Sequence, residues 1–245
     1  MLKKRIVITL TFLDGVLFRT KKFNPDYRYT KNFVDFYSID EIVLVDISKN
    51  KLQESFLKLI EYFVLNCNVP LTVGGGIYEK KQASKLLSLG IEKIILNSSS
   101  YNNLDLINEV SEIHGSQSII HSIDILKKNQ EYIVKFFNNS FTCKLNLFEW
   151  LEELNKRPIG EVIINSIDND GSLMGYDINL INLIEKKIEF PFLVLGGCGN
   201  WHHILQLFEQ TEASAACTQN IFHFSHESVN SLKDFLSQNG QNIRN

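Results

Sequence analysis

Short runs of apolar residues alternate along the chain with segments whose apolar residues recur at helical spacing. The short runs are rich in Ile, Val and Leu and alternate little with polar residues, which is typical of strands buried on both faces of a parallel sheet. We therefore predict eight strands. They occupy Ile6–Leu10, Ile42–Val45, Leu71–Val73, Lys93–Leu96, Ser118–Ile123, Val162–Asn165, Phe192–Leu195 and Ala213–Cys217.

The segments between these runs carry helical patterns. In the clearest one, Leu52, Phe56, Leu59, Ile60 and Phe63 form one apolar stripe on a helix. Strands that alternate with helices predict an α/β fold, and parallel strands joined by right-handed crossovers close most simply as a single (β/α)8 TIM barrel of about 250 residues. The chain has 245 residues. The further helices are predicted at Gln82–Leu89, Leu104–Ile113, Leu147–Leu154, Leu180–Ile184, Ile204–Phe208 and Val229–Leu236.

An internal repeat supports the barrel. The segment 69–76 reads VPLTVGGG, and FPFLVLGGCG at 190–199 repeats its plan about half a chain later. We expect two half-barrels, at about 1–117 and 118–245. An open doubly wound sheet is the alternative, but it offers no reason for such a repeat. Two segments do not fit the plain strand–helix repeat. Thr11–Asn32 is expected to be a long connection, and Lys127–Lys144 is expected to be a β-hairpin that turns at Asn138–Asn139.

Composition and charge exclude several classes of protein. The net charge is −3, with acids and bases scattered along the chain, which argues against a nucleic-acid partner. The four cysteines are far apart and lack metal-ligand spacing, as expected of thiols in a reducing compartment. The apolar run near the N-terminus is too short to span a membrane and has no cleavage site. We expect a cytoplasmic protein without a metal site.

Glycines and polar residues follow the predicted strands. Glycines at 74–76 and at 196–199 would let an anion approach backbone N–H groups, so they predict phosphate binding, whereas a tight βα turn would explain either cluster alone. Carboxylates at strand ends converge on the catalytic mouth of a barrel, although a single one is often only a helix cap. Asp124 directly follows an apolar strand and is the candidate acid or base. The other strand-end polar residues are Asp46, Asn97, Ser98, Asn165, Asp168 and Asp170.

These motifs resemble a known family. VGGGI, LNSSS, SID, INSIDNDGSLMGYD, LGGCG and IFHF occur in order over essentially the whole chain and are similar to the cyclase subunit of imidazole glycerol phosphate synthase, HisF. The sister barrel, the aminoimidazole carboxamide ribonucleotide isomerase, is the nearest competitor. The resemblance implies no cofactor. It implies a HisH-like glutaminase partner at the N-terminal face, ammonia passing through the barrel, and a phosphorylated substrate at the other face.

The resemblance also assigns roles to residues. Asp124 would be one of two catalytic aspartates. A ring of charges at the ammonia entrance would consist of Arg5, Glu41, Lys93 and Glu161. The residues that line the substrate would be Arg19, Asp46, Asn97, Ser98, Asn165, Asp168 and Asp170. The phosphate loops would contain Gly75, Gly76, Gly171, Gly196 and Gly197.

The sequence departs from the family at two places. Thr11 stands where the first catalytic aspartate is expected, and the nearby Asp14 belongs to a turn shared with the family. Gln219 and Asn220 replace small residues of a phosphate loop. Family members from surface-sugar gene clusters, expected to handle a nucleotide-linked or phosphorylated sugar, share the first change and work with a glutaminase and a sugar amidotransferase. We expect an ammonia-receiving barrel for acetamidino formation on a bacterial surface sugar. The alternatives are a working histidine-biosynthesis cyclase and a non-catalytic conduit for ammonia.

Overall fold

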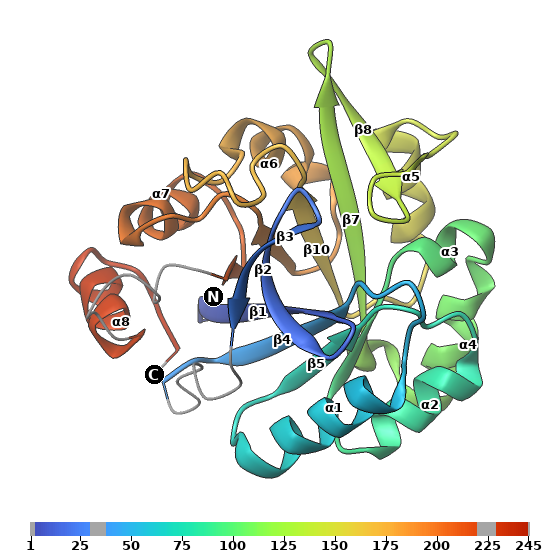
Figure 1. Cartoon of the computed structure of the whole chain (residues 1–245). Coiled ribbons are helices and arrows are strands. Elements are labelled where there is room, and N and C mark those ends of the chain that lie inside the picture. Colours follow the sequence, from blue (N-terminus) through green and yellow to red (C-terminus); the bar gives the residue numbers. More distant parts are fainter. Residues whose placement is uncertain (1–2, 30–37, 220–228, 245) are drawn as a thin grey trace.

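All eight predicted strands are present and form a closed parallel barrel (Figure 1). The computed structural model describes residues 3–29, 38–219 and 229–244. Each barrel strand pairs with the next, and closure comes from β1 pairing with both β4 and β12, and from β7 pairing with β10. The barrel strands are β1 (Arg5–Leu13), β4 (Glu41–Asp46), β5 (Leu71–Gly74), β6 (Lys93–Leu96), β7 (Ile119–Lys128), β10 (Glu161–Ser166), β11 (Phe192–Leu195) and β12 (Ala215–Thr218).

Helices follow the strands and cover the outside of the barrel. All seven predicted helices are found, and side chains cap several of them: Asn146 and Glu149 form a reciprocal capping box at α5, and Asn200 caps α7. The predicted helices are α1 (Glu54–Asn66), α2 (Lys80–Ser88), α4 (Asp105–His114), α5 (Leu147–Asn155), α6 (Ile178–Ile184), α7 (Trp201–Gln210) and α8 (Val229–Gln238). Within the described residues, three short helical segments were not predicted: α3 (Ser98–Asn102), η2 (Ser116–Ser118) and η3 (Glu185–Lys187).

The expectation of a long connection from Thr11 to Asn32 is wrong for its described part. Thr11 lies within β1, and the chain then turns back through β2 (Val16–Lys21) and β3 (Asn24–Tyr29), both antiparallel. Figure 1 shows these two strands in front of the barrel strands. Asn32 lies outside the described residues.

The hairpin predicted within Lys127–Lys144 is confirmed with its turn at Asn138–Asn139, and an additional turn that was not predicted precedes it. β7 runs on to Lys128 and pairs with β8 (Glu131–Phe136), so the first turn is at Asn129–Gln130. Asn138–Asn139 lies in a second turn, before the short β9 (Phe141–Thr142). The hairpin projects away from the barrel (Figure 1).

Alternate residues of each barrel strand face opposite layers of core. On β1, Ile6 and Ile8 pack in the large cluster between strands and helices, whereas Val7 belongs to a second cluster inside the barrel. The interior cluster consists of Val7, Val43, Ile95, Ile120, Ile163, Leu193, Ala215 and Cys217. Arg5, Val7 and Thr11 lie on the same face of β1, which points into the barrel. Along this face Arg5 lies at the polar N-terminal end, Val7 lies in the apolar layer, and Thr11 lies at the polar C-terminal end.

Among the described helices, none is long and apolar enough to cross a membrane. Two contacts tie the described ends of the chain to the N-terminal face of the barrel. Lys4 forms a bridge with Ile243, and Lys233 of α8 makes a buried ion pair of 2.7 Å with Asp40. The first contact joins the residue before β1 to the C-terminal segment, and the second joins α8 to the residue before β4.

Candidate functional site

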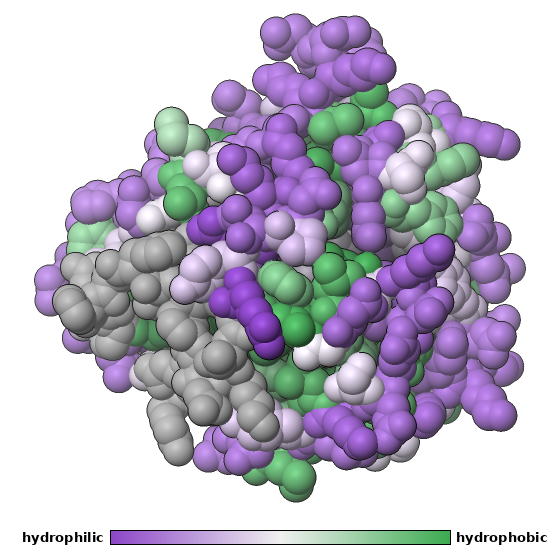
Figure 2. All heavy atoms as spheres, in the orientation of Figure 1, coloured by the Kyte–Doolittle hydropathy of each residue, from purple (hydrophilic) through white to green (hydrophobic). Residues whose placement is uncertain are grey.

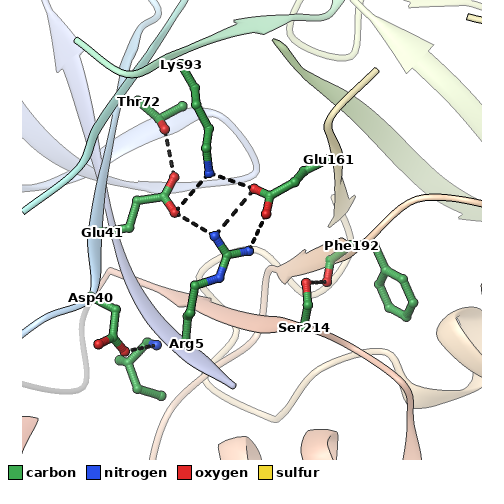
Figure 3. A network of polar contacts seen from close by, with 9 residues as sticks. Arg5, Asp40, Glu41, Thr72, Lys93, Glu161, Phe192 and Ser214 are labelled. Atoms are coloured by element: carbon green, nitrogen blue, oxygen red, sulfur yellow. Dashed lines mark hydrogen bonds and ion pairs between the residues drawn. The ribbon is translucent and has the colours of Figure 1, made fainter. Parts of the chain in front are cut away.

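The four residues of the predicted charged ring meet at the N-terminal end of the barrel (Figure 3). Arg5 lies 3.0 Å from Glu41 and 2.7 Å from Glu161. Lys93 lies 3.5 Å from Glu41 and 2.9 Å from Glu161. Each base therefore contacts both acids, and the ring is closed.

The ring is mostly buried and its charges are matched. Thr72 adds a hydrogen bond of 2.7 Å by donating its hydroxyl to Glu41 Oε1. Burial disfavours the charge on Arg5, but Glu161 and Glu41 outweigh it, so that the pKa of Arg5 is raised. Removing one partner from such a set leaves a desolvated charge and costs several kcal/mol, about 3–5 when burial is complete. The ring is directly below the apolar layer that contains Val7.

A cavity of about 630 Å³ opens at the opposite, C-terminal end of the barrel. Figure 2 shows a mostly hydrophilic surface with hydrophobic residues exposed near its centre. The strand-end polar residues converge here, as expected of a barrel mouth. The predicted residues that line the cavity are Thr11, Asp46, Gly75, Gly76, Asn97, Ser98, Asp124, Asn165 and Asp170.

Asp124 is the buried acid of this cavity. Asn165 donates to its Oδ1 at 2.7 Å and Asn97 donates to its Oδ2 at 2.9 Å. Burial raises the pKa of Asp124 to about 6, although the two amide hydrogen bonds favour the carboxylate and lower it. A carboxyl group with this pKa exists in both protonation states near neutral pH, which suits proton transfer.

A chain of hydrogen bonds connects Asp124 with the β8–β9 turn. The backbone N–H of Phe137 donates to Ser98 Oγ at 2.8 Å, and the Ser98 hydroxyl donates to Asn97 Oδ1 at 2.9 Å. Asn97 then donates to Asp124. The turn therefore fixes the orientation of the amide that contacts the acid.

Thr11 occupies the position expected for a second aspartate. Its side chain is buried and accepts a hydrogen bond of 3.2 Å from Gln219 Nε2. Asp14 also lines the cavity but lies in the β1–β2 turn with φ 44°. An aliphatic hydroxyl group does not ionise near neutral pH, so Thr11 cannot serve as the second acid or base beside Asp124.

The other predicted carboxylates differ in their surroundings. Asp46 accepts the backbone N–H of Ser48 at 2.8 Å and of Leu52 at 2.9 Å, so it shapes the loop after β4. Asp168 lines neither this cavity nor the smaller one described next, and it accepts the backbone N–H of Lys127 at 2.6 Å. Both carboxylates organise the backbone around the mouth.

A second, much smaller cavity of about 20 Å³ lies at the ends of β11 and β12. Arg19, which forms an ion pair with Asp26, lies beside it. The remaining predicted phosphate glycines line it, namely Gly171, Gly196 and Gly197. Asn220 and the IFHF motif lie outside the described residues.

Lys51 and Gln219 are two of the cavity residues that were not predicted from sequence, or not with their observed role. Lys51 lines the large cavity, and its Nζ donates to the backbone carbonyl of Asp46 at 2.9 Å. Gln219, noted as a bulky replacement, bonds to strands β1 and β2. A lysine in a loop is ordinarily solvated, so Lys51 itself gives no sequence signal for a site. The glycine motif that ends at Gly76, against which Lys51 packs, is the sequence feature that marks this part of the cavity.

Comparison with known families decides the wider assignment. The family model described as histidine biosynthesis protein matches residues 4–228. The chain belongs to this family. Two curated members named imidazole glycerol phosphate synthase subunit HisF illustrate the relationship. One from Thermotoga sp. (strain RQ2) is 32% identical over 251 residues, covering 100% of this chain and 98% of the relative. One from Natranaerobius thermophilus is 33% identical over 250 residues, covering 100% of both.

Membership of the histidine biosynthesis protein family agrees with the barrel and with the resemblance seen in the motifs. A third member, from Hydrogenobaculum sp. (strain Y04AAS1), has the same name and is 33% identical over its full length. All three are named as subunits. The family therefore supplies the context in which the charged ring and the cavity at the opposite end are interpreted.

Proposed function

We propose that this chain is the synthase subunit of a two-component enzyme and that it receives ammonia from a HisH-like glutaminase. The observation that carries the proposal is the arrangement along the barrel axis. The ring of Arg5, Glu41, Lys93 and Glu161 lies at one end, and the cavity with Asp124 lies at the other. The glutaminase would bind the face with the ring, and the small-molecule acceptor would bind in the cavity.

The chemistry at the cavity would depend on Asp124. An amine that adds to an electrophilic carbon must lose a proton, and a leaving oxygen must gain one. A single carboxyl group with a pKa of about 6 serves both steps in turn, and the amides of Asn97 and Asn165 hold it in place.

Two acceptors of the ammonia are considered. The names of the relatives favour the histidine-biosynthesis reaction of imidazole glycerol phosphate synthase. Thr11 favours the other, in which a separate sugar amidotransferase uses the ammonia to convert an acetamido group of a bacterial surface sugar to an acetamidino group. In that case the barrel serves as conduit and activator, with Asp124 reduced to a supporting role.

Glutamine turnover tests the shared part of the proposal. A HisH-like glutaminase from the same organism is assayed alone and with the purified barrel, and we expect complex formation and at least tenfold faster glutamine hydrolysis. Lys93→Met should abolish use of glutamine but not of added ammonium salt, because only the entrance is altered. Lys58→Met, at an exposed pair with Glu54, is the matched control. Absence of both binding and stimulation contradicts the proposal.

Complementation separates the two acceptors. Growth of a histidine auxotroph that lacks its own cyclase, and that is rescued by the wild-type chain but not by Asp124→Asn, would establish the histidine reaction. Failure of rescue, together with Asp124-independent amidation in the native sugar pathway, would establish the conduit. The same outcome would exclude Asp124 as the proton-transfer group.

A further inference from the structure

The two glycine-lined ends of the catalytic mouth differ in size. The end with Gly75 and Gly76 opens into the cavity of about 630 Å³, whereas the end with Gly196 and Gly197 keeps about 20 Å³. One water molecule requires roughly 10–15 Å³ on this measure. The small end therefore holds about one water molecule and is too small for a phosphate group with its four oxygens.

The side chain of Gln219 occupies the space at the small end. Its Nε2 donates to Thr11 Oγ1 at 3.2 Å, and its Oε1 accepts the backbone N–H of Thr20 at 3.2 Å. Strand β2 also lies close to Gly171: a Cβ atom there would be 2.9 Å from Lys21 Cα and from the Thr20 carbonyl oxygen. Gln219 and β2 together fill this end.

The charges at the small end do not favour a second anion. Asp170 lies on its wall, where it accepts the backbone N–H of Phe23 at 3.3 Å. The guanidinium of Arg19 is ion-paired with Asp26. A dianion placed here would have to compete with Asp26 for the arginine and would face a second carboxyl group at close range.

The large end has a cation held over the glycine loop. The stem of Lys51 covers Gly76, since a Cβ atom at this glycine would lie 2.2 Å from Lys51 Cβ. Gly76 has φ +76°, a conformation that glycine adopts without strain. Two acids, Asp46 and Asp14, act electrostatically on Lys51, and the carboxylate oxygens of Asp46 already accept the backbone N–H groups of Ser48 and Leu52. The ammonium group of Lys51 therefore remains able to pair with a ligand anion.

We infer that the ligand of this cavity is asymmetric, with one anionic group such as a phosphate monoester beside Lys51 and Gly76, and an uncharged hydrogen-bonding group at Gln219. Gln219 is then a specificity-determining residue, because its amide offers a donor and an acceptor where a second phosphate would need a vacant cradle. The inference rests on the proposed function only in treating the cavity as the acceptor site.

Phosphate titration of the purified chain, without any glutaminase, tests this inference. Binding of inorganic phosphate is followed by ³¹P NMR and calorimetry, and we expect one phosphate per chain. Lys51→Met should weaken this binding at least tenfold, and Lys51→Arg, which keeps the charge, should restore it. Arg19→Met should leave the dissociation constant within twofold. Gln219→Gly should open the small end and raise the stoichiometry to two.

Several outcomes would overturn the inference. They are two phosphates on the wild-type chain, no phosphate binding at all, or one phosphate that Arg19→Met weakens while Lys51→Met does not. An unchanged stoichiometry in a folded Gln219→Gly chain would show that Gln219 does not exclude the second anion. None of these outcomes depends on glutaminase stimulation, so the inference and the proposed function can fail separately.

Discussion

The side-chain amide of Gln219 lies 3.2 Å from the hydroxyl of Thr11 and joins the end of the last barrel strand to the first. The bond joins both positions at which the sequence departs from its family. The two departures are therefore one local feature of the structure: a neutral pair stands where the family resemblance predicts a carboxylate and a small residue.

A double-mutant cycle tests this coupling. Thr11→Val should cost about 1 kcal/mol of unfolding free energy in the wild-type background and close to nothing in Gln219→Ala, since the hydrogen bond is already absent there. Chemical denaturation of the four proteins measures both costs. Strictly additive effects would show that the bond contributes nothing to stability.

Asp124 predicts a pH dependence of stability. Its folded pKa of about 6 is above the ordinary value of 3.8, so its contribution is fully present below about pH 4 and is lost as the pH rises through 6. The loss is on the order of 2–3 kcal/mol. Unfolding free energies between pH 4 and 8 should therefore fall more steeply with rising pH for wild type than for Asp124→Asn. Parallel profiles would contradict the raised pKa.

His121 predicts a stability that changes with pH in the opposite direction, rising as the pH rises. It is completely buried on β7 against Trp150, and neither ring nitrogen has a hydrogen-bond partner among the described residues. Burial lowers its pKa to about 3, so its contribution to stability is present above about pH 6.5 and is lost as the pH falls toward 3.

Replacing His121 should thus increase resistance to acid. When the pH is lowered from 7 to 5, the free energy of unfolding of His121→Leu should fall by about 2 kcal/mol less than that of the wild type. Urea unfolding at both pH values measures this difference. His202→Leu, at an exposed position on α7, is the control and should follow the wild-type profile. An equal loss in wild type and His121→Leu would exclude a buried neutral imidazole.

Gly75 and Gly15 form a matched pair for a test of close packing. Their φ angles are +99° and +94°, but a Cβ atom at Gly75 would lie 2.2 Å from the Asp46 carbonyl oxygen, whereas nothing lies within 4 Å of one at Gly15. Gly15→Ala should cost about 1 kcal/mol from backbone strain alone, and Gly75→Ala at least about 3 kcal/mol. Equal melting temperatures of the two variants would refute the packing argument.

The barrel could be predicted from sequence because strands buried on both faces are almost purely apolar. Strands β2 and β3 were missed for a physical reason: their turn uses Lys22 and Phe23, both with positive φ, in place of the usual Gly or Asn. In β2 only Leu17 and Thr20 are buried, and because they are three residues apart they do not form the alternation that would have indicated a strand.

The candidate site was predictable to a similar degree. The charged ring was expected from the family resemblance, and its meeting agrees with the fold because strand starts meet at one end of a barrel. Its members Arg5, Glu41, Lys93 and Glu161 start four strands. The bridge made by Gln219 could not be expected, because it joins residues about two hundred positions apart through a flexible side chain. The half-barrel repeat stays a prediction. It gains support from Gly75 and Gly196, which lie against the carbonyl oxygens of Asp46 and Ser166.

The ring at the N-terminal end has two acids and two bases, and its formal charge is zero. A cation that enters there gains no net attraction, and it must compete with Arg5 or Lys93 for a carboxylate. A neutral molecule would meet only a steric obstacle there. Under the proposed function, the charge balance of the ring therefore favours entry of uncharged ammonia over entry of the ammonium ion.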